Sequence, residues 1–368
     1  QLFITGANLY KKIDQKKFKE IPGCPIGYWL SQNLLNSFIR KVALEDDCQF
    51  KKGMSTGDNT KFIRNWQEIN INNIFFNCNS QKDSMSSNLK WYPINSGGGF
   101  RKWYGNQEWV VNWLNNGLEM KENAIKLNHG GHWSRYIVST DKFFKEGLSW
   151  NAISSRNICV RIFGKGFLFG SASMCGYGRD LSYIIGLLNS CVSTDILKVL
   201  APTMNYGPLQ IKKIPLIHKN KEYVDNIVSS NISISKLDWD AHETSWDFKE
   251  NELLRIFHEQ AGESNINESR ESESNSYDKT NNDPIENGNS PSLRQTVSDS
   301  QKTTTTTLQQ CLDRYKLEWT DKFIQLHDNE EELNRQFIDI YGLQDELKPD
   351  VPLNEITILQ QGEISIKD

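Results

Sequence analysis

Residues 51–66, KKGMSTGDNTKFIRNW, combine two glycines with lysines and an arginine in one short polar stretch. Glycine lets the backbone come close to a ligand, and amides at the start of a helical turn can donate to a phosphate. Asp58 or Asn59 is a typical N-cap for such a turn. The stretch therefore predicts a phosphate-binding loop, and a plain surface turn before a strand or helix is the alternative. The residues assigned to it are Lys51, Lys52, Gly53, Thr56, Gly57, Asp58, Asn59 and Arg64.

A second candidate for nucleic-acid contact is the segment FRKWYGN, which follows a run of three glycines. It places Arg101 and Lys102 directly before Trp103 and Tyr104. Cations neutralise phosphates, and an aromatic ring can stack on a base for about 1–3 kcal/mol. The alternative is that the tryptophans of this region belong to the core, as we expect for Trp109 and Trp113.

The residue types of an active site do not come together in this sequence. No two of the ten prolines are adjacent, so the Asn/Asp-Pro-Pro-aromatic motif of amino methyltransferases is missing from these 368 residues. The glycine pair in FGKGF is more typical of a hairpin turn than of a cofactor loop. His129 and His132 lie in HGGH without a third ligand at metal spacing. We therefore assign no catalytic, cofactor-binding or metal-binding residue.

The elements that position these segments follow from hydrophobic spacing and from turn residues. The pattern indicates a mixed α/β (α+β) domain with glycine-rich loops. The expected elements are helices at 28–42, 108–117 and 181–200, a strand-turn-strand unit at 90–105, a hairpin at 157–170 and a strand at 209–217.

The C-terminal part has a different composition. Residues 262–306 are rich in Ser, Asn, Glu and Thr and hold almost no large apolar residue, which predicts a disordered linker. Apolar residues then recur at 3–4 spacing through 307–345, which predicts a helical hairpin or a short coiled coil.

Charge is distributed unevenly along the chain. Residues 1–220 contain 28 Lys and Arg against 15 Asp and Glu, a net of +13. Residues 221–368 contain 14 against 31, a net of −17. Such an imbalance favours contact between the first part and a polyanion such as nucleic acid, although lysines can also simply solvate a surface.

Cysteine usage and hydropathy indicate in which cellular compartment the protein is expected. The seven cysteines are scattered, without a CxxC pair, which is typical of free thiols in a reducing cytosol. No apolar run is long enough to span a membrane, and the start shows no signal-peptide core. We expect a cytoplasmic protein. Because the chain begins at Gln1, we also expect a processed protein or a piece of a longer one.

Seven segments carry a resemblance to a known family. In order along the chain they are GMSTGDNTKFIRNWQEI, KWYPINSGGGFRKWYGNQEWVVNW, FFKEGLSWNAISS, IIGLLNSCVSTDILKVLAPTMNY, IKKIPLI, DWDAHETSWDF and NEEELNRQFIDIYGLQDEL. They closely resemble the middle of the PglX family, the adenine-specific DNA methyltransferases of BREX phage-exclusion systems. That family is similar in layout to type IIG restriction–modification enzymes.

The resemblance implies recognition of a short DNA site and N6-adenine methylation that marks self DNA. It implies an S-adenosylmethionine domain before this stretch in a full-length parent, and it adds Asn205 and Tyr206 to the DNA-binding residues. The chain is then expected to be an internal fragment that binds double-stranded DNA and is inactive alone. An active enzyme with an unseen motif and a protein-interaction scaffold for other BREX proteins are the alternatives.

The expected domain order follows from the composition and the resemblance together. It is a helical connector at 1–45, a target-recognition domain at 46–217, a helical extension at 218–261, the linker at 262–306, the helical hairpin or coiled coil at 307–345 and a tail at 346–368.

Overall fold

The computed structural model describes residues 15–27, 30–39, 42–154, 156–203, 205–260 and 307–359. The chain divides into two compact units, one made of Gln1–Phe248 with Lys322–Asp368 and the other of Lys249–Asp321. The expected mixed α/β class is confirmed, because the first unit contains two four-stranded sheets and many helices. The linker expected at 262–306 lies outside the described residues.

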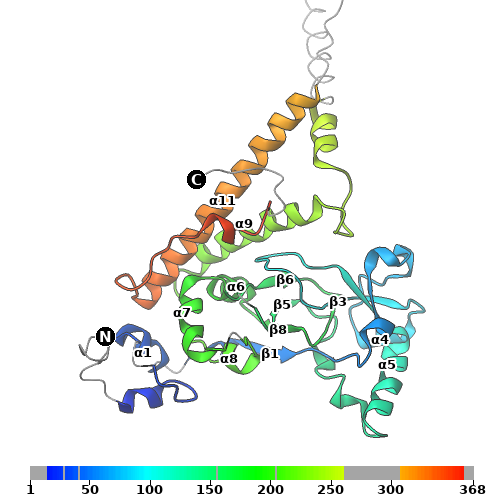
Figure 1. Ribbon diagram of the computed structural model, residues 1–368, viewed down its shortest axis with the longest axis horizontal. Coiled ribbons are helices and arrows are strands. Elements are labelled where there is room, and N and C mark those ends of the chain that lie inside the picture. Colours follow the sequence, from blue (N-terminus) through cyan, green and yellow to red (C-terminus); the bar gives the residue numbers. More distant parts are fainter. Residues whose placement is uncertain are drawn as a thin grey trace, which may run out of the picture. The chain divides into compact units, whose positions relative to one another are not determined.

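The first sheet is antiparallel throughout and has the strand order β1-β8-β5-β6. Its central strand β8 is almost completely buried, so both of its faces are covered. In Figure 1 these strands lie beside α6, α7 and α8. The strands are β1 (Cys48–Lys52), β5 (Gly147–Asn151), β6 (Arg161–Phe163) and β8 (Ser173–Gly178).

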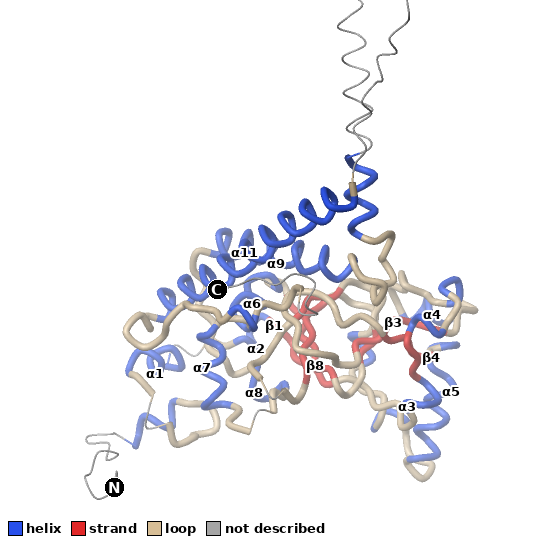
Figure 2. The backbone as a smooth tube through the Cα atoms, turned by 45° about the horizontal axis from the view of Figure 1, so that its top comes forward, coloured by secondary structure: helices blue, strands red, loops and turns tan. Residues whose placement is uncertain are grey.

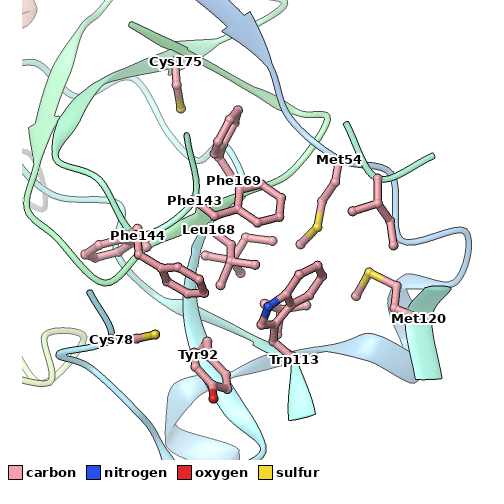
Figure 3. Packing of buried hydrophobic residues seen from close by; sticks show 14 of the residues in the cluster. Met54, Cys78, Tyr92, Trp113, Met120, Phe143, Phe144, Leu168, Phe169 and Cys175 are labelled. Carbon is pink, nitrogen blue, oxygen red and sulfur yellow. The ribbon is translucent and has the colours of Figure 1, made fainter. Parts of the chain in front are cut away.

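The second sheet has the order β2-β4-β3-β7, and only its β3–β7 pair is parallel. Its strands are β2 (Ile63–Asn65), β3 (Trp91–Asn95), β4 (Trp109–Asn112) and β7 (Leu168–Phe169). An aromatic core packs against this sheet, with Phe143 in edge contact with Trp113 and Phe169 at ring distances of 5.3 and 5.6 Å (Figure 3). Edge-to-face packing of this kind adds to the stabilisation that comes from burial.

Helices surround the sheets in the first unit. The apolar helix α6 (Leu181–Leu188) is buried, and α9 (Lys221–Asp240) runs beside the second half of α11 (Figures 1 and 2). The other helices are α1 (Gln32–Ile39), α2 (Leu44–Asp47), α3 (Asn59–Phe62), α4 (Gln81–Ser86), α5 (Leu114–Leu127), α7 (Cys191–Leu200) and α8 (Pro208–Ile211). Short 3-10 turns are η1 (Gln15–Glu20), η2 (Trp66–Glu68), η3 (Ile71–Asn73), η4 (Trp133–Arg135), η5 (Thr140–Lys142) and η6 (Leu353–Glu355).

The second unit pairs a helix at 252–260 with the first part of α11 (Leu308–Tyr341). Arg255 forms ion pairs with Glu252, Glu259 and Glu318 at 2.7–2.9 Å. The helical character expected for 307–345 is confirmed, but residues 308–341 form one continuous helix and not a hairpin. No glycine or proline lies between Leu308 and Tyr341 to break it.

Five expected elements differ from the structure. The helix expected at 181–200 is two helices, α6 and α7, and the second strand expected within 90–105 is reduced to a single bridge between Trp103 and Arg161. Residues 108–117 begin as strand β4, because Val110 and Val111 are fully buried between β2 and β3. The expected hairpin at 157–170 does not form, since β6 joins the first sheet and β7 the second. Residues 209–217 contain helix α8 followed by a single bridge at Pro215. Pro208 at the first position of α8 favours that helix start.

All seven cysteines are free thiols, and only Cys24 is exposed. Burial raises the pKa of Cys48 to about 12 and that of Cys78 to about 11. Among the described helices, none is long and apolar enough on its own to cross a membrane. By length and composition, α6 and α7 together could do so, with a bend of 72° between them.

Candidate nucleic-acid interface

The loop that follows β1 is held against the second sheet by its backbone. A Cβ on Gly53 would lie 2.2 Å from the carbonyl oxygen of Gly170, so only glycine fits there. The Met54 amide donates to the Phe169 carbonyl at 3.0 Å, and the Ser55 amide donates to the Tyr136 carbonyl at 2.8 Å. These two amides are therefore occupied by protein carbonyls.

The second half of the same loop starts α3. Asp58 is the N-cap, as expected, and its carboxylate accepts from the Lys61 amide at 3.0 Å. Thr56 is buried and donates its hydroxyl to Asn59, while Gly57, Asp58 and Asn59 are exposed. A carboxylate at the start of this helix disfavours a second anion there. Phosphate binding by residues 53–59 stays a prediction.

The cations around this loop differ in exposure and in the contacts that they already make. Lys51 is half-buried in β1, whereas Lys52 at the end of that strand is exposed. Arg64 donates to the carbonyls of Thr60 and Ile63 and lies over the Trp91 ring at 6.0 Å. Lys52 is therefore the cation of this stretch that is best placed to contact a ligand.

Arg101 is engaged inside the protein. Its guanidinium forms an ion pair with Asp238 of α9 at 2.7 Å and donates to the carbonyls of Tyr104, Ser235 and Thr357. Only 15% of its side chain is exposed. These contacts fasten the segment to α9 and to the chain near residue 357.

Lys102 and Trp103 share one carboxylate. The Lys102 ammonium lies 2.6 Å from one oxygen of Glu330 in α11, and the Trp103 indole N–H donates to the other at 2.7 Å. Lys102 and Glu330 are each 4% exposed and Trp103 is 1% exposed. In this conformation these side chains face the protein interior and offer neither a phosphate contact nor a stacking face. Their contact with DNA stays a prediction that this geometry does not support.

Tyr104 is half-buried beside the same network. Its hydroxyl donates to the Gln107 side-chain oxygen at 3.3 Å, and the Lys236 ammonium lies 4.9 Å from its ring. Burial raises the pKa of Tyr104 above its ordinary value, so the phenol keeps its proton.

One end of the first sheet is marked by the exposed side chain of Lys52. There Lys52 of β1 lies opposite Met174 of β8, and Met174 lies opposite Trp150 of β5. One residue further, Ser173 lies opposite Asn151. A glycine loop, residues 97–99, lies between β3 and β4 of the second sheet and contacts this end of the first sheet, where the Gly97 amide donates to the Ser173 hydroxyl at 2.7 Å.

Side-chain amides hold the glycine loop in place. Asn151 donates to the Gly98 carbonyl at 2.7 Å, and Asn106 donates to the Gly99 carbonyl at 2.9 Å. Both glycines are exposed, and Gly98 has a φ of +138°, which favours glycine. In the described part of the chain, the amides of Gly98 and Gly99 have no acceptor. The loop therefore presents two free donors to solvent.

Arg156 and Asn205 border this loop. Arg156 lies over the Phe100 ring at 5.2 Å, and its carbonyl accepts from the Tyr206 hydroxyl at 3.3 Å. Asn205 forms a bridge with Ile153 and is exposed. Tyr206 is thus linked through Arg156 to Phe100, the residue that follows the glycine loop. Tyr206 itself is 8% exposed and positions its neighbours.

A buried cation lies behind the loop. Arg161 is 2% exposed and donates to the side-chain oxygen of Asn151 at 3.0 Å and to the Arg101 carbonyl at 3.1 Å. No described carboxylate forms an ion pair with it. Burial lowers the pKa of Arg161 from its ordinary value. An uncompensated positive charge in a low-dielectric interior favours an anion at the nearby surface.

We call Lys52, Gly98, Gly99, Arg156 and Asn205 the sheet-end surface. The sequence identified Lys52 and Asn205 but missed the other three. In the sequence, the run of three glycines points to this loop, but by itself it predicts only a turn.

Comparisons with known proteins identify two sequence relatives of the chain. The adenine-specific methyltransferase PglX of Lacticaseibacillus casei (strain Zhang) is 32% identical over 367 residues, which are 97% of this chain and 27% of that protein. The adenine-specific methyltransferase BrxX of Escherichia coli O9:H4 (strain HS) is 34% identical over 258 residues, 68% of this chain and 20% of that protein. The chain thus spans about a quarter of the length of these relatives. No known family model matches it.

Among solved structures, the type IIL restriction-modification enzyme MmeI in complex with DNA gives a TM-score of 0.38 at 15% identity. The match covers 57% of this chain and 30% of the MmeI chain, and at this level it supports no inference. The two sequence relatives carry the assignment, in agreement with the seven segments that resemble PglX. The chain belongs to the family of the adenine-specific methyltransferases PglX and BrxX.

Proposed function

We propose that this chain is the DNA-recognition part of a site-specific N6-adenine DNA methyltransferase that acts in BREX phage defence. Membership of the PglX and BrxX family supports this proposal. The 368 residues contain no Pro-Pro motif, so we also propose that the chain alone transfers no methyl group. S-adenosylmethionine is then held by other residues of a full-length protein. The free thiols favour a cytoplasmic location.

The observation that carries the DNA-binding proposal is the sheet-end surface. Two unoccupied amides at Gly98 and Gly99 come directly before Phe100, whose ring the Arg156 guanidinium covers, and Lys52 ends β1 of the first sheet. Backbone amides with Arg and Lys are the groups that bind DNA phosphates and fix the register of a protein on the duplex. The buried charge of Arg161 adds to the attraction for an anion.

Asn205 is proposed to contact a base edge. Its side chain is exposed, and the described residues offer its amide no hydrogen-bond partner. An Asn amide can pair with adenine through one donor and one acceptor, which contributes about 1–3 kcal/mol of discrimination. Phosphate contacts from Lys52 and Arg156 would then position this side chain.

The proposal is tested by titrating the purified chain against duplex DNA at several salt concentrations. Two or more phosphate contacts should give a log–log salt slope of about −2 or steeper. In parallel, labelled S-adenosylmethionine should leave no label on the DNA. A slope near zero would contradict DNA recognition, and incorporated label would contradict inactivity.

A protein-interaction scaffold is the second candidate. The observation in its favour is the net charge of −17 over residues 221–368. An acidic helical region suits a basic protein surface, and other BREX proteins are the proposed partners. Two results together would favour this candidate over the first. DNA binding would show no salt dependence, and the chain would capture a BREX protein in a way that charge reversal in α11 abolishes.

A further inference from the structure

A cavity of about 420 Å³ opens in the first unit. It lies where residues 71–77, the 104–107 loop and the 164–167 turn meet residues 246–247. None of its lining residues belongs to the sheet-end surface. Pockets for small ligands range from about 300 to 1,000 Å³ and combine apolar walls with a few polar groups.

Three aromatic rings form one wall of this cavity. Trp246 lies 5.1 Å from the Phe76 ring and 5.8 Å from the Phe167 ring, the latter at an interplanar angle of 37°. Trp246 and Phe76 are half-buried, so part of each ring faces the cavity opening. Tyr104 adds a fourth ring to the lining. Such a wall favours a flat aromatic ligand over an aliphatic one.

A buried amide lines the same cavity. Gln107 is only 4% exposed, and its side-chain oxygen accepts from the Tyr104 hydroxyl. Within the described residues, the side-chain NH2 of Gln107 has no acceptor. This NH2 is not one of the buried polar atoms that lack a partner, so it reaches solvent in the cavity, where a ligand that brings an acceptor can replace water as its partner.

Two charged residues complete the lining. Lys165 is exposed and has no ion-pair partner among the described residues. Asp247 is exposed, and its carboxylate, which lies 3.7 Å from the Lys236 ammonium, is able to accept a hydrogen bond from a ligand. A ligand that fits both would carry a hydrogen-bond donor on its ring and a negative charge beside it.

We propose that this cavity binds a nucleobase, with its phosphate beside Lys165. A nucleotide combines a flat ring, an acceptor for Gln107, an amino donor for Asp247 and an anion for Lys165. An aromatic side chain from a protein offers the ring without the polar edge or the anion. The base comes either from a free nucleotide or from an unpaired position in DNA. The inference does not depend on DNA contact at the sheet-end surface.

Equilibrium dialysis of the four nucleoside monophosphates against the full chain tests this site. We expect saturable binding of at least one of them, and Trp246→Leu should weaken it by about tenfold or more. The matched control is Trp133→Leu, because Trp133 is also half-buried against the same core and does not line the cavity. Equal affinity in wild type and Trp246→Leu would overturn the proposal.

A surface variant keeps the test valid if Trp246→Leu does not fold. Wild type should bind the monophosphate more tightly than the nucleoside, and Lys165→Ala should remove this preference while Lys145→Ala keeps it. An unchanged preference in Lys165→Ala would overturn the proposal.

A DNA hairpin with one unpaired base, measured against a fully paired hairpin, separates the two sources. Tighter binding of the unpaired hairpin that depends on Trp246 assigns the site to DNA. Binding of monophosphates alone assigns it to free nucleotides, and binding of neither overturns the proposal. Because fully paired DNA reports on the sheet-end surface, its binding in Trp246→Leu should match wild type, so the two proposals fail separately.

Discussion

Two adjacent segments of this chain, Gly97–Phe100 and Arg101–Trp103, have opposite environments. The first is a loop with two exposed glycines, free amides and a single cation–π contact to Arg156. The second holds the densest run of cations and aromatics near the glycines, and its side chains face inward to Asp238 and Glu330. Composition alone would assign DNA contact to the second segment, whereas its burial favours the first.

The difference comes from partners that are far away in the sequence. Glu330 is 228 residues from Lys102, and Asp238 is 137 residues from Arg101. A lysine is buried only when a carboxylate reaches it, because an unpaired buried charge is strongly unfavourable. Whether Arg101 and Lys102 are surface groups is therefore decided by α9 and α11.

The largest expected effect is the difference in stability between replacing a buried lysine and replacing an exposed one. Lys102→Met leaves the Glu330 carboxylate without its ammonium partner, so the free energy of unfolding should fall by about 3–5 kcal/mol. Lys52→Met, at an exposed position, should change it by less than about 0.5 kcal/mol. Urea unfolding of both variants measures the difference. Equal stabilities would mean that Lys102 is not buried against Glu330.

A smaller effect concerns the indole that shares the same carboxylate. Trp103→Phe keeps an aromatic ring but removes the N–H donated to Glu330, which should cost about 1.5–3 kcal/mol. Phe100→Leu in the neighbouring exposed segment should cost less. Thermal unfolding of the two variants is the measurement. If Trp103→Phe is neutral in stability yet weakens DNA binding, the stacking role expected from the sequence regains support.

Alanine substitution should also affect stability differently at Gly53, in the loop after β1, and at Gly99, in the glycine loop. Gly53→Ala forces a Cβ onto the Gly170 carbonyl, and such overpacking costs about 1–3 kcal/mol of stability. At Gly99 a Cβ would meet nothing within 4 Å, so Gly99→Ala should be nearly neutral. Chemical denaturation of both variants compares them. A destabilised Gly99→Ala would show that this loop is packed and not open.

The sequence predicted much of the local structure. The helix α1, the Asp58 cap, the mixed α/β class and the free thiols are set by short-range spacing or by residue type. It could not predict that the segment WVVN is a strand or that β6 and β7 join different sheets. Those outcomes depend on pairing with distant strands, and the pattern over a few residues fits a helix or a hairpin equally well.

The exposure of the predicted DNA-binding residues could be foreseen only in part for the same reason. Lys52 and Asn205 are exposed, but Arg101, Lys102 and Trp103 are enclosed by α9 and α11. Exposure of a cation is a property of the whole fold, which residue types within one segment do not encode.

The central claim is that the sheet-end surface holds DNA phosphates. Its most direct test is the salt dependence of duplex binding by a double variant that carries Lys52→Ala and Arg156→Ala. The control is Lys82→Ala, which removes an exposed cation on α4. We predict that the double variant flattens the log–log slope by about two, roughly one for each phosphate that is no longer neutralised, and that the control leaves it unchanged. A double variant with the slope of wild type, in a protein of unchanged stability, would contradict the claim.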